Sequence, residues 1–426
     1  MISVAEHKKP QYRLASEKFF TPRKLYLALS QHTGKPSRPC VKAGDMVPEA
    51  AILAERDGLI SSHLHAPSSG KVLAIEEWYH PTLKRAPSII LECTPEPKIY
   101  TPRNGVEKFN KKELLDIIAA SGIVGLGGAA FPTHVKLAPP EAVDTLIING
   151  CECEPYLTTD CRLMVEQLEQ ICRGAEIISR IIEPKKVIFT LEDNKPEAIK
   201  KMQHMLRTRT NALPSAKLVV LRTAYPQGGE KQLIYATLKR KVPPGKLPFN
   251  VGCLVQNVAT CFALYETIYL NKPLIERLVT FAGDALNTPK NIWIKIGTTL
   301  KELFDQKVLF FKEEPQKIIC GGPMMGISLN HLDYPILKGA GGFLFLRSTH
   351  SDEESACIRC ARCVDACPMN LLPLEYAKRV KHDDYTTLEE LNIKDCIECG
   401  ACAHECPAKI PLVQYIKIGK KYASNS

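Results

Sequence analysis

The feature that most constrains this chain of 426 residues is a run of four closely spaced cysteines near its carboxyl end, which occurs twice. Both runs have the form Cys-x₂-Cys-x₂-Cys-x₃-Cys-Pro, and they begin at Cys357 and Cys396. This spacing is typical of bacterial two-cluster ferredoxins, in which three thiolates of a run bind one cubane and the fourth binds the other. Zinc ribbons also use Cys-x₂-Cys pairs, but zinc is saturated by four ligands and leaves the remaining thiols of each run unexplained. The sequence therefore predicts two [4Fe–4S] clusters.

The crossover of the fourth cysteine assigns four thiols to each cluster. Cluster 1 is predicted to be held by Cys357, Cys360, Cys363 and Cys406. Cluster 2 is predicted to be held by Cys367, Cys396, Cys399 and Cys402. Residues 351–426 are accordingly expected to form an α-helical ferredoxin-type domain. Two neighbouring clusters indicate a relay of single electrons rather than chemistry on a substrate.

Composition and charge further limit the classes of protein and of partner that fit this chain. The length predicts about three domains, and 45% hydrophobic with 24% charged residues is typical of a globular chain. Of the formal charge of +10, a share of +7 lies in residues 1–42, the basic arm, which has nine Lys or Arg and two acids. The arm is expected either to be solvated or to dock on an acidic partner or an anionic membrane face. Nucleic acid is not expected as a partner, because no aromatic interleaving or binding motif accompanies the charge.

Hydrophobic patterning predicts three units before the cysteine-rich segment. Residues 1–100 combine the basic arm with short apolar bursts and turn residues, which indicates a small β domain. Residues 111–272 alternate strand and helix patterns, which predicts a parallel α/β sheet that binds ligands at the carboxyl ends of its strands. Residues 273–350 return to short strands and are expected to form a compact module. The strands expected in the parallel sheet include 144–149, 187–191 and 217–221.

A glycine-rich segment, Gly125-Leu-Gly-Gly-Ala-Ala-Phe-Pro-Thr-His-Val-Lys136, is a candidate cofactor site. It mimics a dinucleotide fingerprint, but that fingerprint should follow a strand and open a helix, whereas a helix pattern precedes this one. The favoured interpretation is a loop whose backbone amides cradle a phosphate or a ring, with Lys136 as the counter-charge. Polar residues at the ends of three predicted elements either extend this site or are turn residues. These are Asn149-Gly-Cys-Glu-Cys-Glu-Pro155, Tyr225-Pro-Gln-Gly-Gly-Glu-Lys231 and Gln256-Asn257.

These motifs, in this order, carry a resemblance to a known family. From about residue 28 to 417 the chain resembles the C subunit of the Rnf (Rsx) electron transport complex, a membrane-associated ion-pumping NADH:ferredoxin oxidoreductase of bacteria. The likeness includes the glycine-rich segment, both cysteine runs, and Gly321-Gly-Pro-Met-Met-Gly326. The central domain of that family is similar to the NADH-binding flavoprotein subunit of respiratory complex I.

The resemblance implies a multidomain α/β fold and a set of cofactors. In chain order it implies a lipoyl-like β barrel-sandwich, a Rossmann-like FMN/NADH domain, a β-grasp module of the SLBB type, and the two-cluster ferredoxin domain. The cofactors are the two [4Fe–4S] clusters and FMN, with NADH as electron donor or acceptor. The residues implied to hold FMN are Gly125, Gly127, Gly128, Lys136, Asn149, Glu152, Tyr225, Glu230 and Asn257. Phe131 and Glu154 are implied to lie near the nicotinamide nucleotide.

The resemblance also implies a cellular location and a role in electron transfer. It implies a peripheral subunit on the cytoplasmic side of the bacterial inner membrane, which passes electrons from NADH through FMN and both clusters to the other subunits. Ferredoxin would be reached through those partner subunits, and no catalytic acid or base is required. One alternative is a flavin-dependent cobalamin reductase of a bacterial microcompartment, built from similar modules. The other is a non-catalytic relay subunit that holds clusters without flavin.

Overall fold

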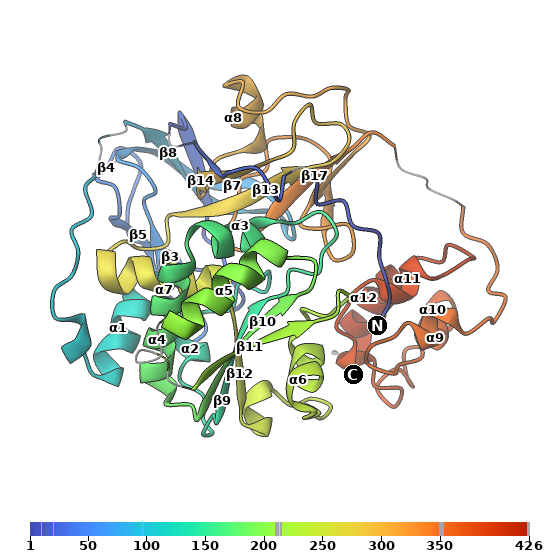
Figure 1. Ribbon diagram of the computed structural model, residues 1–426. Coiled ribbons are helices and arrows are strands. Elements are labelled where there is room, and N and C mark those ends of the chain that lie inside the picture. The colour runs from blue at the N-terminus through green and yellow to red at the C-terminus, as the bar shows by residue number, and fades with distance from the viewer. Residues whose placement is uncertain are drawn as a thin grey trace.

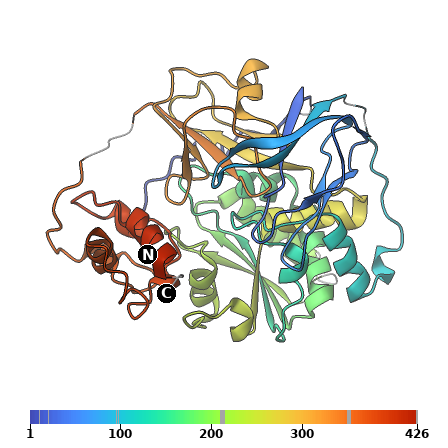
Figure 2. The same cartoon turned by 180° about the vertical axis from the view of Figure 1, so that it is seen from behind.

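The computed structural model describes residues 1–9, 11–19, 21–94, 96, 98–208, 213, 215–348 and 353–423 (Figure 1). The chain up to residue 348 is built on four sheets with helices and loops between their strands, and a helical unit follows. The boundary predicted at residue 351 lies within 349–352, outside the described residues. Figures 1 and 2 show the helical carboxyl-terminal unit, in red, beside α6 (Glu230–Leu238) in both views.

The amino-terminal unit is built from two small antiparallel sheets that share one apolar core. Residues of strand β2 alternate between the two faces, so that Leu25 and Leu27 are fully buried while Lys24 is exposed. This is the small β unit expected from the turn-rich sequence. The sheet of order β2-β8-β7-β4 contains β2 (Lys24–Ala28), β8 (Lys84–Cys93), β7 (Gly70–His80) and β4 (Met46–Val47). The other contains β3 (Arg38–Pro39), β5 (Ile52–Glu55) and β6 (Leu64–His65).

The central unit is a four-stranded parallel sheet of order β11-β10-β9-β12 with helices packed against it (Figure 1). The predicted parallel sheet is thereby confirmed, and its central strands β9 and β10 are buried, as expected for strands covered on both faces, whereas the edge strand β11 is partly exposed. The strands are β9 (Thr145–Gly150), β10 (Lys186–Glu192), β11 (Ala216–Leu221) and β12 (Cys253–Asn257). The helical segments are η1 (Val106–Lys108), α1 (Lys111–Ala120), α2 (Thr133–Lys136), α3 (Thr159–Glu166), α4 (Leu168–Ile182), α5 (Pro196–Thr208), α6, η2 (Pro248–Val251) and α7 (Val258–Leu270).

A six-stranded mixed sheet of order β1-β14-β13-β17-β15-β16 forms the third unit. Its edge strand β1 (Glu17–Phe19) comes from the basic arm and pairs in parallel with β14. The arm is therefore not simply solvated, because part of it completes a sheet more than 250 residues away in the chain. The other elements are β13 (Glu276–Ala282), β14 (Lys290–Lys295), α8 (Leu300–Asp305), β15 (Lys317–Cys320), β16 (Ile327–Leu329) and β17 (Gly342–Leu346).

The carboxyl-terminal unit repeats one small motif. Arg359 and Ala361 have positive φ, and so do Glu398 and Gly400, which are separated from them by the same offset that separates Cys357 from Cys396. Each pair leads into a one-turn helix, so the repeated sequence folds into a repeated loop. None of the helices described here has the length and apolar character needed to cross a bilayer. The helical segments are α9 (Arg362–Asp365), α10 (Pro373–Lys381), η3 (Ile393–Asp395), α11 (Ala401–His404) and α12 (Leu412–Ala423).

Candidate electron-transfer site

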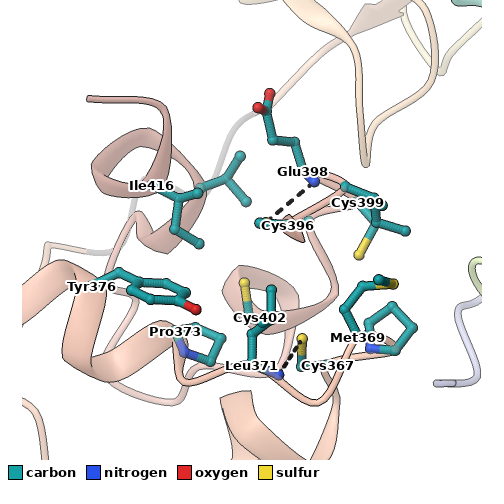
Figure 3. A pocket seen from close by; sticks show the side chains of 14 residues that line it. Cys367, Met369, Leu371, Pro373, Tyr376, Cys396, Glu398, Cys399, Cys402 and Ile416 are labelled. Carbon is teal, nitrogen blue, oxygen red and sulfur yellow. Dashed lines mark hydrogen bonds between the residues drawn. The ribbon is translucent and has the colours of Figure 1, made fainter. Parts of the chain in front are cut away.

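Two cavities in the carboxyl-terminal unit are each lined by four cysteines, and Figure 3 shows one of them. Each encloses about 350 to 360 Å³ of empty space, part of it open to solvent. The first, called the proximal cavity, is lined by Cys367, Cys396, Cys399 and Cys402. The second, called the distal cavity, is lined by Cys357, Cys360, Cys363 and Cys406. Each cavity thus brings together the four thiols that the cysteine spacing assigns to one cluster.

The proximal cavity fits an iron–sulfur cluster in its donors and in its walls. Figure 3 shows Cys367, Cys399 and Cys402 turned toward the cavity, between apolar walls that include Tyr376 and Ile416. Burial raises the pKa of the Cys399 thiol to about 11 and that of Cys402 to about 12. Apolar surroundings oppose a bare thiolate, so these groups need a bound metal centre to become anionic ligands.

Backbone amides already point at two of the proximal sulfurs. The Leu371 amide donates to Cys367 Sγ at 3.4 Å, and the Glu398 amide donates to Cys396 Sγ at 3.3 Å (Figure 3). Such N–H···S bonds stabilise negative charge on a ligand sulfur and tune the potential of a cluster. The positive φ of Glu398 and Gly400 turns the loop so that its amides face inward.

The proximal cavity lies against the central unit. The Tyr225 hydroxyl, on a side chain only 2% exposed, donates to the Cys399 carbonyl at 2.6 Å. Gln232 Nε2 contacts Met369 Sδ at 3.0 Å, and Met369 lines the cavity. A side chain at Gly400 would place its Cβ 2.6 Å from the Met324 carbonyl oxygen, so this close approach requires glycine. Tyr225 is thus bonded to the carboxyl-terminal unit, and its contact with a flavin stays a prediction.

The glycine loop, residues 125–128, lies at the carboxyl end of β12. The Leu126 amide donates to Thr260 Oγ1 at 2.9 Å, and a Cβ at Gly127 would meet the Asn257 side chain at 3.2 Å. Gly128 has φ +116°, which favours glycine, and no atom lies within 4 Å of the place where its Cβ would be. Gly125 is held by its amide, which donates to the Phe131 carbonyl at 2.9 Å. The loop therefore leaves open space beside its backbone, as a phosphate or ring cradle must.

Predicted flavin residues surround this loop at the strand ends. Lys136 and Glu230 form an ion pair at 2.7 Å, and Asn149 Nδ2 donates to the Gly228 carbonyl at 2.9 Å. Asn257 is the N-cap of α7, where its side chain accepts from the Ala259 amide. The carboxyl ends of β9 and β12, which carry these polar residues, thus lie side by side at the end of the sheet where parallel α/β folds bind ligands.

Two predicted carboxylates have protein partners in this structure. Glu152 caps α3: its oxygens accept from the Asp160 amide at 2.8 Å and from the Cys161 amide at 3.1 Å. Glu154 accepts from the Met324 and Met325 amides at 3.2 and 2.9 Å, and burial raises its pKa. Both side chains shape the loop that follows β9, and their contact with a nucleotide stays a prediction.

Four ionisable residues of this region were not anticipated from sequence. Lys8 Nζ, from the basic arm, donates to the Glu152 carbonyl at 2.5 Å, and Lys195 donates to the Cys151 carbonyl. Arg277 donates to the Leu126 carbonyl at 3.3 Å and so fixes the glycine loop. Asp160 accepts from Asn257 Nδ2 at 2.6 Å. Lys8, Asp160 and Arg277 belong to no motif, so only the tertiary fold reveals them.

Family comparisons identify three of the four units. Residues 118–266 match the model of the Nuo51 FMN-binding domain, residues 2–96 that of the RnfC barrel sandwich hybrid domain, and residues 356–410 that of the 4Fe-4S dicluster domain. The predicted barrel-sandwich, flavin-type and two-cluster units are thereby confirmed. Residues 273–350 lie outside these matches, so the β-grasp assignment stays a prediction, as do the boundaries 1–100, 111–272 and 351–426.

Curated relatives align with nearly the whole chain. The C subunit of the proton-translocating ferredoxin:NAD(+) oxidoreductase complex of Clostridium ljungdahlii is 45% identical over 408 residues, which is 93% of this chain and 87% of that protein. The C subunit of the Na(+)-translocating complex of Acetobacterium woodii is 40% identical over 94% of this chain and 91% of its own length. The C subunit of the ion-translocating oxidoreductase complex of Haemophilus influenzae is 40% identical, and the chain spans 60% of it.

Among solved structures, the fold is similar to a chain of an NAD+-reducing [NiFe]-hydrogenase in the air-oxidized state. The TM-score is 0.52 at 16% identity, with 75% of this chain and 65% of that chain covered. This likeness shows a shared fold.

The buried carboxyl of Asp160 generates a prediction about pH. Burial, and next the Glu152 carboxylate, raise the pKa of Asp160 from 3.8 to about 7. Folded Asp160 therefore keeps its proton between about pH 4 and pH 7, where the unfolded chain has lost it, and the free energy of unfolding falls as pH rises through this window. Asp160→Asn removes this contribution. We expect the variant to match the parent in melting temperature near pH 4 and to exceed it by several degrees near pH 8.

Thermal melts of both proteins across this pH range check the prediction. Asp116→Asn, at an exposed position of α1, is the matched control and should follow the parent throughout. Parallel pH profiles for the parent and Asp160→Asn would contradict the assignment of a protonated Asp160.

Proposed function

The chain belongs to the family formed by the C subunits of ion-translocating ferredoxin:NAD(+) oxidoreductase complexes, and on this premise we propose that it exchanges electrons between NAD(H) and its partner subunits. It is an oxidoreductase subunit with an FMN-binding type of domain and a two-cluster ferredoxin domain. Membership in the complex implies association with a membrane, and we place the protein peripherally on the cytoplasmic side of the bacterial inner membrane. Ferredoxin is reached through the partner subunits.

One observation carries the proposal: the cluster unit is docked on the flavin-type domain through a cluster-ligand residue. Tyr225 lies in the loop after β11, at the carboxyl-terminal end of the sheet, where the glycine loop also lies. Its hydroxyl donates a hydrogen bond to the Cys399 carbonyl. Cys153, which follows β9, packs in the same small apolar cluster as Tyr225 and Cys399. The nucleotide-binding edge and the proximal cavity are therefore joined by direct contacts.

The residues of the chain bind and orient the cofactors. When bound, FMN converts hydride transfer with NAD(H) into single-electron steps that the clusters carry onward. We assign the phosphate of FMN to the amides of the glycine loop and to Lys136, and the ring to the space between this loop and the polar ends of β9 and β12. The eight cysteines hold the clusters in the two sets that ring the cavities. No side chain is required as a catalytic acid or base.

The positions of the two cavities indicate the order in which electrons pass between the cofactors. The proximal cavity contacts the central unit, whereas Cys357 and Cys360 of the distal cavity are exposed. We infer that electrons pass between flavin and the proximal cluster, and between the distal cluster and a partner. The flavin-type domain supports this role over a relay without flavin, and the names of the relatives support it over a cobalamin reductase.

The ligand assignment predicts the iron content of a cysteine variant. Cys363→Ala removes one ligand from the distal cavity, so iron in the anaerobically reconstituted chain should fall from about eight to about four per molecule. Acid-labile sulfide should fall in proportion. Cys40→Ala, at an exposed cysteine of the amino-terminal unit, is the control and should keep about eight irons. A Cys363→Ala chain that keeps about eight irons would contradict the assignment.

The phosphate assignment predicts the flavin affinity of a lysine variant. Lys136→Ala removes a charge-assisted contact and leaves the Glu230 carboxylate without its partner, so FMN should bind about 10- to 100-fold more weakly. Fluorescence titration of the flavin-free protein measures this change. Lys186→Ala, an exposed lysine at the opposite end of the same sheet, should bind FMN like the parent. If Lys136→Ala also keeps the parent affinity, the phosphate does not lie at this loop.

A further inference from the structure

The internal repeat of the carboxyl-terminal unit allows its two cluster loops to be compared position by position. The proximal loop, residues 396–401, and the distal loop, residues 357–362, have the same cysteine spacing and the same positive-φ positions. Their surroundings differ. The proximal loop is buried or half-buried along its length, whereas all six residues of the distal loop are exposed.

The apolar residue after the first cysteine of each loop shows that only the surface of the proximal loop is covered. Ile397 packs in the apolar cluster that contains Tyr225 and joins the unit to the central domain. Its counterpart Ile358 is 68% exposed, among the most exposed large hydrophobic side chains described. The proximal loop is thus a docking surface already covered by a domain of this chain, and the distal loop presents the equivalent surface uncovered.

Two further positions of the repeat distinguish the loops by charge and by fit. Glu398 pairs with Lys420 at 2.7 Å, while its counterpart is Arg359. Buried Ala401 corresponds to exposed Arg362. In the part of the chain that the structure describes, neither arginine has an ion-pair partner, and no acid occurs in residues 355–364.

The two loops also differ at the position of Gly400, because only the proximal loop packs closely against a neighbouring segment. Gly400 approaches the Met324 carbonyl so closely that a Cβ would lie 2.6 Å from its oxygen, and the counterpart Ala361 carries a methyl group in exposed surroundings. The proximal loop is fitted to a fixed neighbour, while the distal loop has no such neighbour among the described residues.

We propose that the distal loop is the docking surface for an acidic electron-transfer partner, whose carboxylates pair with Arg359 and Arg362 beside Ile358. An exposed apolar residue followed in the same loop by two arginines without ion-pair partners is complementary to an acidic rim beside a small apolar centre. Passage of one electron across this surface oxidises the donor centre by one electron and reduces the partner centre by one, and no bond is made or broken. The proposal rests on the proposed function only in requiring a cluster in the distal cavity.

The test measures electron transfer from the reconstituted full-length chain to an acidic two-cluster bacterial ferredoxin as the probe. The chain is reduced with dithionite, freed of excess reductant and mixed with oxidised ferredoxin in a stopped-flow instrument. For Arg359→Glu combined with Arg362→Glu, we expect the second-order rate constant to fall about 10-fold or more at low ionic strength, because the steering charge is reversed. The difference should shrink toward the parent rate at high salt.

A matched variant, Lys111→Glu combined with Lys112→Glu on α1, makes the same change in net charge at another exposed site and should keep most of the parent rate. A small neutral quinone should accept electrons from all three proteins at equal rates. Ile358→Ala should slow transfer to ferredoxin a few-fold without changing iron content. A parent-like rate for the double arginine variant at low salt would overturn the proposal, and so would an equal loss in the lysine variant or with the quinone.

These readouts separate the docking surface from the proposed function. Because dithionite supplies the electrons, the ferredoxin assay does not depend on flavin or NAD(H). A chain that lacks flavin would therefore refute the NAD(H) role while leaving the docking result intact.

Discussion

The hydrogen bond from the Tyr225 hydroxyl to the Cys399 carbonyl fixes how the carboxyl-terminal unit sits at the carboxyl ends of the strands of the parallel sheet. A buried phenol without a partner is unfavourable by about 1 to 3 kcal/mol, so the contact favours one docked arrangement over the alternatives. It also joins the two candidate sites directly, since Tyr225 belongs to a strand-end loop and Cys399 to the four cysteines that line the proximal cavity. The asymmetry between a covered proximal loop and an exposed distal loop follows from this docking.

Buried charge organises the region at the carboxyl ends of the strands. Glu192 is fully buried and pairs with Lys195, and Lys8 reaches the same region from the basic arm. Burial of ionised groups is unfavourable unless each is paired and hydrogen-bonded, so this network holds the loop after β9 in one shape before any cofactor binds. The arm, which also supplies β1, thereby links the central unit to the six-stranded sheet.

Much of this architecture could be predicted from the sequence, for identifiable physical reasons. Cluster ligation depends on short-range spacing, so the two runs beginning at Cys357 and Cys396 suffice to group the eight thiols that the fold brings together. Parallel strands place their polar ends at one edge, which is why Asn149 and Asn257 could be expected side by side. Side-chain partners could not be foreseen. The bonds from the first-turn amides of α3 to Glu152, the approach of Lys8 and the contact of Tyr225 with Cys399 all join segments that are distant in sequence or depend on local geometry.

We infer that the proximal cluster lies between the flavin and the distal cluster. Freeze-quenched EPR of dithionite-reduced, FMN-loaded protein mixed with NAD⁺ tests this order, with Cys402→Ala and Cys363→Ala as the chains that lack one cluster each. We expect the remaining cluster to be rapidly oxidised in Cys363→Ala and to stay reduced in Cys402→Ala. Rapid oxidation of the distal cluster in Cys402→Ala would contradict it.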